Sequence, residues 1–67
     1  MNWDQIAGNW EQLTGKVKEK WGKLTDDDIQ TIAGRRDQLA GKIRERYGYE
    51  KEQAELELNE FIRTVRV

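Results

Sequence analysis

The sequence predicts an all-helical protein that is built from a duplicated helical unit. Residues 6–22 and 32–48 are near-copies at an offset of 26 residues, and nine of their seventeen aligned pairs are identical. Apolar side chains recur every three or four residues in both copies, as on one face of an amphipathic helix. The chain has 67 residues and no proline, and 37% of its residues are charged. These features favour a single small domain over residues 1–67, with a charged helical surface around a thin core.

The first helix is predicted over residues 3–21. Gly22 follows directly and is expected to adopt the left-handed conformation that commonly ends a helix. Lys18 and Lys20 lie in the last turn, where the negative end of the helix dipole favours cations. The apolar stripe of this helix consists of Trp3, Ile6, Trp10, Leu13 and Val17, with Trp21 beside it.

A second helix is predicted to start at residue 26. Thr25 precedes three aspartates, and a threonine hydroxyl at the N-cap accepts a hydrogen bond from a backbone N–H of the first turn. Asp28 stands where the glutamate of a capping box would stand. The three carboxylates are therefore interpreted as helix capping, because the spaced ligands, glycine and closing glutamate of an EF-hand loop do not follow them.

The run that begins at residue 26 is expected to divide at Gly34, which Arg35 and Arg36 follow. The division gives a short helix over residues 26–32 and a longer one over residues 34–47. A left-handed Gly48 is expected to end the longer helix, as Gly22 is expected to end the first.

A last helix, outside the repeat, is predicted over residues 50–63. Its apolar stripe is Ala54, Leu58 and Phe61, continued by Val65, and five glutamates make the rest of the segment acidic. The acidic face is interpreted as a solvated surface that can lie against the basic ends of the two repeats. Exposed ion pairs contribute only ~0–1 kcal/mol each, so apolar packing is expected to provide most of the stability.

Six glycines recur every seven residues within the two repeats, at positions 8, 15, 22, 34, 41 and 48. Those at 8, 15, 34 and 41 fall inside the predicted helices, where each costs about 1 kcal/mol relative to alanine. The favoured interpretation is close helix contact or a kink. Two alternatives stay open, namely helices kept weak so that they fold on a partner or in changed solvent, and a close approach of a ligand to the backbone.

The composition excludes several classes of function. The chain has no cysteine and no histidine, which removes thiol chemistry, cysteine-ligated metals and the commonest general base. We therefore expect no enzymatic activity, no cofactor and no metal. The N-terminus has no basic segment and no long apolar run, so neither a secretory signal nor a membrane span is expected. A cytoplasmic monomer is the default, and a net charge of −1 makes nucleic-acid binding unlikely.

A few residues are candidates for binding a partner. The Gly-Lys pairs at 15–16 and 41–42 do not form a phosphate loop, because the glycine spacing is wrong and no Ser or Thr follows the lysine. The tryptophans are interpreted as core rather than as a stacking platform, although Trp10 stands out because arginine replaces it in the second repeat. The candidate partner-binding residues are Trp10, Arg35, Arg36, Lys42, Arg44 and Arg46.

Several short motifs resemble the CsbD-like family of small bacterial stress proteins. They are Gly8-Asn9-Trp10, residues 15–19, the run from Trp21 to Asp28, residues 38–43 and Tyr47-Gly48-Tyr49, so the likeness spans roughly residues 5–55. The resemblance implies expression in the general stress response, a cytoplasmic location and a compact four-helix fold of two crossed helical hairpins, similar to sterile-alpha-motif domains. It implies no enzymatic activity and no cofactor.

Three hypotheses for function follow. The leading one is a non-enzymatic stress-response protein that binds an unidentified macromolecular partner through a helical surface. The first alternative is a weakly folded protectant that gains helix under osmotic stress or desiccation, as the interior glycines and the high charge suggest. The second alternative is a nucleic-acid-binding module that uses the arginines and lysine of the second repeat, with an affinity that falls steeply with salt.

Overall fold

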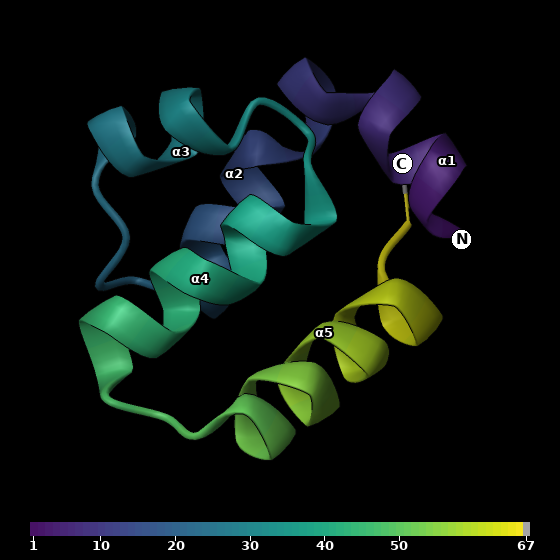
Figure 1. Cartoon of the computed structure of the whole chain (residues 1–67). Helices are drawn as coiled ribbons and strands as arrows, with labels where there is room; N and C mark the ends of the chain where they lie inside the picture. The colour runs from purple at the N-terminus through teal and green to yellow at the C-terminus, as the bar shows by residue number, and fades with distance from the viewer. Residues whose placement is uncertain (67) are drawn as a thin grey trace.

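The computed structural model describes residues 1–66 and contains five α-helices (Figure 1). The helices are α1 (Trp3–Gly8), α2 (Trp10–Lys20), α3 (Asp26–Ile32), α4 (Arg36–Tyr47) and α5 (Lys51–Thr64). No strand occurs in residues 1–66, so the all-helical class is confirmed. The arrangement as two crossed hairpins of four helices stays a prediction.

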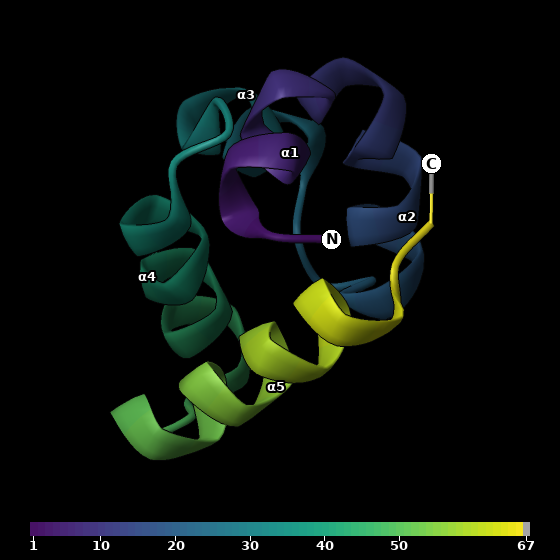
Figure 2. The ribbon, with the colours of Figure 1, turned by 90° about the vertical axis from the view of Figure 1, so that its right-hand side faces the viewer.

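The helices surround one core to which each of them contributes. α4 packs against both α3 and α5, and α1 packs against α2. Figures 1 and 2 show α5 below the other four helices in both views. The amino group of Met1 donates a hydrogen bond of 2.8 Å to the carbonyl of Ile62, which joins the first residue to the end of α5. The core consists of Ile6, Leu13, Val17, Trp21, Leu24, Ile29, Ile32, Leu39, Ile43, Ala54, Leu58, Phe61 and Val65.

Tryptophan packing agrees with the interpretation of the tryptophans as core. Trp21 is 1% exposed, and its ring centroid lies 5.1 Å from that of Phe61. Trp3 and Trp10 are half-buried and pack against the core from the side, with their ring centroids 6.4 Å apart. Within the described residues no helix is both long enough and apolar enough to cross a membrane.

The single helix predicted over residues 3–21 is wrong, because the chain breaks at Asn9 into α1 and α2. Asn9 has φ −114° and ψ 25°, which are not helical, and its side-chain amide donates a hydrogen bond of 2.9 Å to the carbonyl of Gln5. Such a local hydrogen bond from a side chain to the backbone competes with the hydrogen bonds of a helix. Gly8 precedes Asn9 and lowers the free-energy cost of leaving the helical conformation.

The expected left-handed end at Gly22 is also wrong, since Gly34, Gly48 and Ala33 are the described residues with positive φ. α2 ends at Lys20, and Trp21 takes φ −121° and ψ 76°, a conformation that accompanies the burial of its ring in the core. Gly48 does end α4 in the left-handed conformation, with φ 70°.

The predicted break at Gly34 is confirmed, although α4 begins at Arg36 and not at residue 34. Ala33 and Gly34 both have positive φ, 47° and 79°, and with Arg35 they form the three residues that separate α3 from α4. A Cβ on Gly34 would lie 3.5 Å from the Cα of Ala7, and the indole N–H of Trp3 donates to the Gly34 carbonyl at 3.0 Å. Gly34 is thus the point where α1 approaches the turn between α3 and α4.

The same Gly→Ala substitution is expected to have opposite effects within the glycine series. Gly15 and Gly41 lie inside helices, and a Cβ there meets no atom within 4 Å, so alanine should raise the free energy of unfolding by about 1 kcal/mol at each. Gly34 and Gly48 have positive φ, so alanine should lower it by about 1 kcal/mol at each. Urea unfolding of the four single variants measures this, and four shifts of one sign would contradict it.

Candidate functional site

The candidate cations lie in different environments. Lys42 and Arg46, both on α4, share one of them. Both approach Asp28 at the start of α3, which is 4% exposed. Arg46 donates from Nε to Oδ2 at 2.8 Å and from Nη2 to Oδ1 at 3.0 Å, and the Nζ of Lys42 lies 3.6 Å from Oδ1. These two cations are therefore used within the fold, where they join α4 to α3.

Asp28 also forms the predicted capping box. Its backbone N–H donates to the hydroxyl of Thr25 at 3.1 Å, and the Thr25 N–H donates to the Asp28 carboxylate at 3.0 Å. The hydrogen bond from Arg46 and the backbone hydrogen bond from Thr25 hold the pKa of Asp28 well below its usual range, against the opposing effect of burial. Asp28 in turn raises the pKa of Arg46. A carboxylate held ionised in this way is unsuited to act as a general acid or base near neutral pH.

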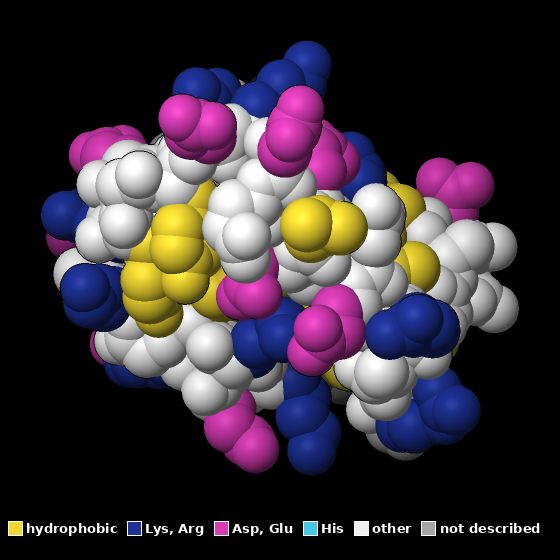
Figure 3. Space-filling model, turned by 90° about the horizontal axis from the view of Figure 1, so that it is seen from below, with side chains coloured by type: hydrophobic (Ala, Val, Ile, Leu, Met, Phe, Trp, Pro, Cys, Tyr) yellow, Lys and Arg dark blue, Asp and Glu magenta, His cyan; other side chains and the backbone are white. Residues whose placement is uncertain are grey.

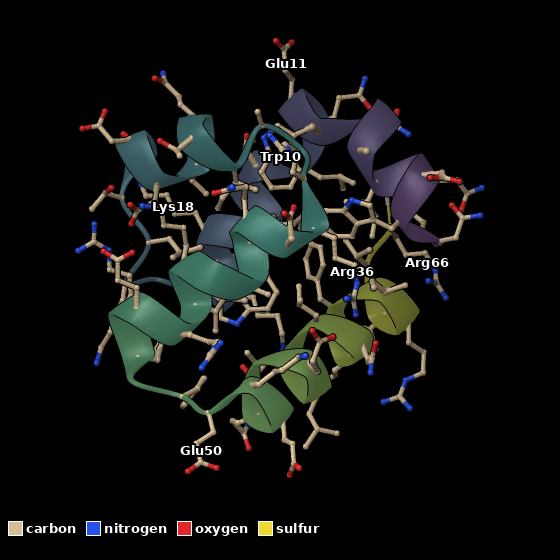
Figure 4. All side chains as sticks on the ribbon, viewed as in Figure 1. Trp10, Glu11, Lys18, Arg36, Glu50 and Arg66 are labelled. Carbon is tan, nitrogen blue, oxygen red and sulfur yellow. The ribbon has the colours of Figure 1, made fainter. Side chains whose placement is uncertain are left out.

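The remaining candidate cations lie along the rest of α4. Arg36 donates to the Glu55 carboxylate of α5 at 2.7 Å, and Figure 4 shows it reaching from α4 toward α5. Arg35 is exposed and stands 4.0 Å from its neighbour Asp37. Arg44 is exposed and forms no ion pair within residues 1–66. The five cations of the second repeat thus do not form one continuous basic surface.

Trp10 lines a groove of about 610 Å³ between α2 and α3, which we call the first groove. Gly15 lies on one wall of this groove, and Ile29 and Ala33 lie on the other. Lys18 and Asp26, from opposite walls, form an ion pair of 2.6 Å. Figure 4 shows Trp10 and Lys18 on the same side of the molecule, near α3.

A second groove of about 600 Å³ lies between α4 and α5. Ala40 and Gly41 form the middle of its α4 wall, and Ala54 forms part of its α5 wall. These small residues are flanked by five charged ones, namely Arg36, Asp37, Arg44, Lys51 and Glu55. Arg44 and Lys51 stand at this groove, and no described residue forms an ion pair with either of them. The second groove therefore carries a positive excess beyond the Arg36–Glu55 pair.

The two grooves are equivalent with respect to the sequence repeat. Five lining positions of one groove correspond to five of the other at the offset of 26 residues, in the pairs Trp10/Arg36, Glu11/Asp37, Thr14/Ala40, Gly15/Gly41 and Lys18/Arg44. The conserved member is glycine, and the most divergent is the pair of Trp10 and Arg36. The grooves thus share a scaffold but offer an aromatic wall in one case and a cationic wall in the other.

Sequence reasoning found Trp10, Arg36 and Arg44 but did not place them in grooves. The favoured interpretation of the interior glycines as close helix contact or a kink is wrong at positions 15 and 41, which lie inside helices and where a Cβ would meet no atom within 4 Å. It holds at Gly8, which directly precedes the break at Asn9. Lys51 was missed because a lysine in the first turn of a helix carries no signal of its own. The recurrence of glycine every seven residues was the signal that could have indicated a groove. One of the two alternatives that it left open was a close approach of a ligand to the backbone at these glycines.

Comparison with known proteins finds one family over most of the chain. The family model described as CsbD-like matches residues 4–55. The chain is 54% identical over 66 residues to the UPF0337 protein RPA4217 of Rhodopseudomonas palustris, an alignment that covers 98% of this chain and 100% of the relative. It is 67% identical over 58 residues to the UPF0337 protein YjbJ of Escherichia coli K12, with 87% and 84% covered.

Proposed function

We propose that this chain, which belongs to the CsbD-like family, is a non-enzymatic stress-response protein that binds a macromolecular partner through the second groove. The role in the stress response and the cytoplasmic location rest on the resemblance to the family. The use of the second groove rather than the first rests on its unpaired cations: no described residue forms an ion pair with Arg44 or Lys51, whereas Lys18 of the first groove is paired with Asp26. Gly41 leaves open space beside these cations on a helix that alanine would make more stable. No atom of the same chain would clash with a larger residue at this position, so the glycine leaves room for a partner.

The proposal is tested by photo-crosslinking in living cells under osmotic or starvation stress. p-Benzoylphenylalanine in place of Arg44 should give one discrete adduct, because this residue stands at the second groove. The matched control carries the crosslinker in place of Lys18, which is the equivalent position of the first groove. Adding Gly41→Leu should remove the adduct at position 44. No adduct at position 44, or the same adducts at both positions, would contradict the proposal.

A conditionally folded protectant is the second candidate function, and the open glycines favour it as well. Gly15 and Gly41 together lower helix stability by about 2 kcal/mol, although neither contacts another residue that would require it. If a loose native state protects other proteins, the Gly15→Ala/Gly41→Ala variant should protect a drying-sensitive enzyme several-fold less well than the unmodified chain. Equal protection by both would remove this candidate.

Nucleic-acid binding has less support from the structure. Lys42 and Arg46 share a buried carboxylate, and Arg36 is engaged with Glu55, so the cationic charge that the second repeat offers to solvent is small. Binding of single-stranded DNA that weakens steeply between 50 and 200 mM salt would revive this candidate (about 10³-fold is expected for six phosphate contacts).

A further inference from the structure

We propose that the occupant of the second groove is α5 of a second copy of this chain, so that two copies form a weak symmetric dimer. The inference rests on the proposed function of the second groove as a docking site. It is carried by a second surface on the same molecule that matches this groove in shape and in charge.

The matching surface is the outward side of α5. Leu56 is 63% exposed and is the exposed large hydrophobic side chain of residues 1–66. Glu52 and Glu60 stand one turn before and after it, and both are exposed. Glu60 forms an ion pair of 3.2 Å with Lys20 of α2, whereas no described residue forms an ion pair with Glu52. Figure 3 views the molecule from the side of α5, and its hydrophobic side chains form isolated patches among Lys, Arg, Asp and Glu side chains. α5 thus presents a leucine within an acidic surface.

The second groove offers the complementary features. Its small lining at Ala40, Gly41 and Ala54 leaves room for a leucine, and a Cβ on Gly41 would meet no atom within 4 Å. Arg44 and Lys51 supply cations that no described residue pairs with, and their charge is opposite to that of the unpaired Glu52 on the outward side of α5. Asp37 and Glu55 also line the groove and oppose any anion, so its net positive charge is small. A small positive excess beside small side chains suits a leucine flanked by a glutamate better than a polyanion of many phosphates.

The positions of these surfaces on α5 are compatible with two-fold symmetry. Lys51 and Glu55 line the groove, and Leu56 projects about 100° further around the helix than Glu55, toward solvent. When two copies of α5 run side by side about a two-fold axis, each can lie over the groove of the other, with Leu56 directed at the small residues of α4. Such an exchange is reciprocal and closed, so it gives dimers and no filaments.

The contact involves one helix and one groove from each copy. We expect it to bury less surface than the roughly 800 Å² per partner of a stable interface. We therefore expect a dissociation constant on the order of 0.1 mM. Arg44, Lys51 and Glu52 are all exposed, so raising the salt concentration from 0.05 to 0.5 M should weaken association several-fold.

Sedimentation equilibrium of the whole chain between 10 µM and 1 mM tests the inference. The mass should rise from the monomer value of 7.9 kDa toward twice that value. Leu56→Ala and Gly41→Leu should each weaken association at least tenfold. Gly15→Leu is the matched control, because it makes the same change at the equivalent position of the first groove and should leave association unchanged. Circular dichroism should show both leucine variants at least as helical as the unmodified chain.

A constant mass of 7.9 kDa up to 1 mM would overturn the inference, and so would equal association of the Gly41→Leu and Gly15→Leu variants. The crosslinking experiment distinguishes the failure of the dimer from the failure of the second groove as a docking site. A discrete adduct at position 44 with a different protein or with nucleic acid, lost in Gly41→Leu, would overturn the second copy as occupant. It would leave the second groove as the docking site. An adduct of twice the monomer mass supports the inference.

Discussion

Trp21→Ala is expected to remove about 3–5 kcal/mol from the free energy of unfolding. The side chain is 1% exposed, its ring centroid lies 5.1 Å from that of Phe61, and its indole N–H donates to the carboxylate of Glu57 at 3.3 Å. Replacing a buried tryptophan by alanine costs about 3–5 kcal/mol. A chain of 67 residues has a free energy of unfolding of about 3–10 kcal/mol, so the substitution removes much or all of it.

Thermal unfolding followed by circular dichroism measures this effect. Since about 1 kcal/mol shifts the Tm of a domain of this size by about 4–8 °C, Trp21→Ala should lower it by at least 12 °C or abolish the transition. Trp10→Ala is the control, because Trp10 is half-buried at the edge of the core and should cost much less. Similar losses for the two variants would show that the core does not depend on Trp21 in the way its burial indicates.

Asp28→Asn is expected to lower the free energy of unfolding by about 2 kcal/mol at pH 7. The substitution removes the carboxylate that caps α3 and receives two hydrogen bonds from Arg46 on α4. An N-terminal cap is worth about 1 kcal/mol, and a charge-assisted hydrogen bond adds about as much or more. The Arg46 side chain is 38% exposed, so water reduces its share of the effect.

The pH dependence of this difference follows from the direction of the pKa shift. The pKa of Asp28 is lower in the folded protein than in the unfolded chain, so its contribution is fully present above the unfolded value of about 3.9. The contribution is then lost as the pH falls from there through the folded pKa. Urea unfolding at pH 7 and at pH 2.5 should therefore show the difference between the unmodified chain and Asp28→Asn shrinking in acid.

Asp27→Asn serves as the control for this experiment. Asp27 lies in the same turn of α3 but is exposed, so its replacement should change stability by at most about 0.5 kcal/mol. A difference between Asp28→Asn and the unmodified chain that stays constant from pH 7 to pH 2.5 would mean that the carboxylate charge is not what stabilises the contact between α3 and α4.

Periodicity and local capping signals predicted most of the fold. The bounds of α3, the last residue of α4, the capping box at Thr25 and the left-handed Gly48 depend on interactions within a few residues, so the sequence displays them directly. The break at Asn9 and the conformation after Lys20 could not be predicted in the same way. In the second case the conformation of Trp21 goes with its burial against Phe61, which lies 40 residues away along the chain.

The candidate site was predictable as a set of residues but not as a surface. The sequence indicated Lys42 and Arg46 as cations, but only the packing of α3 on α4 brings Asp28 to them and removes them from consideration as a free basic surface. The grooves likewise depend on which helices pack together, because Gly41 becomes part of a groove only when α5 lies beside α4. Equivalent positions in the repeat predict the equivalent helices α2 and α4, but not their ends, since Gly48 is left-handed and Gly22 is not. The far wall of each groove is formed by a helix that begins outside the repeat.

The central claim is that the second groove exists before a partner arrives, and amide hydrogen exchange followed in ¹⁵N–¹H NMR spectra of the dilute protein tests it most directly. We predict well-dispersed peaks and slow exchange for the core-facing amides of α4 and α5, such as those of Ile43 and Leu58. Collapsed peaks with fast exchange throughout the chain would contradict a preformed groove and would instead support a protectant that folds only under stress.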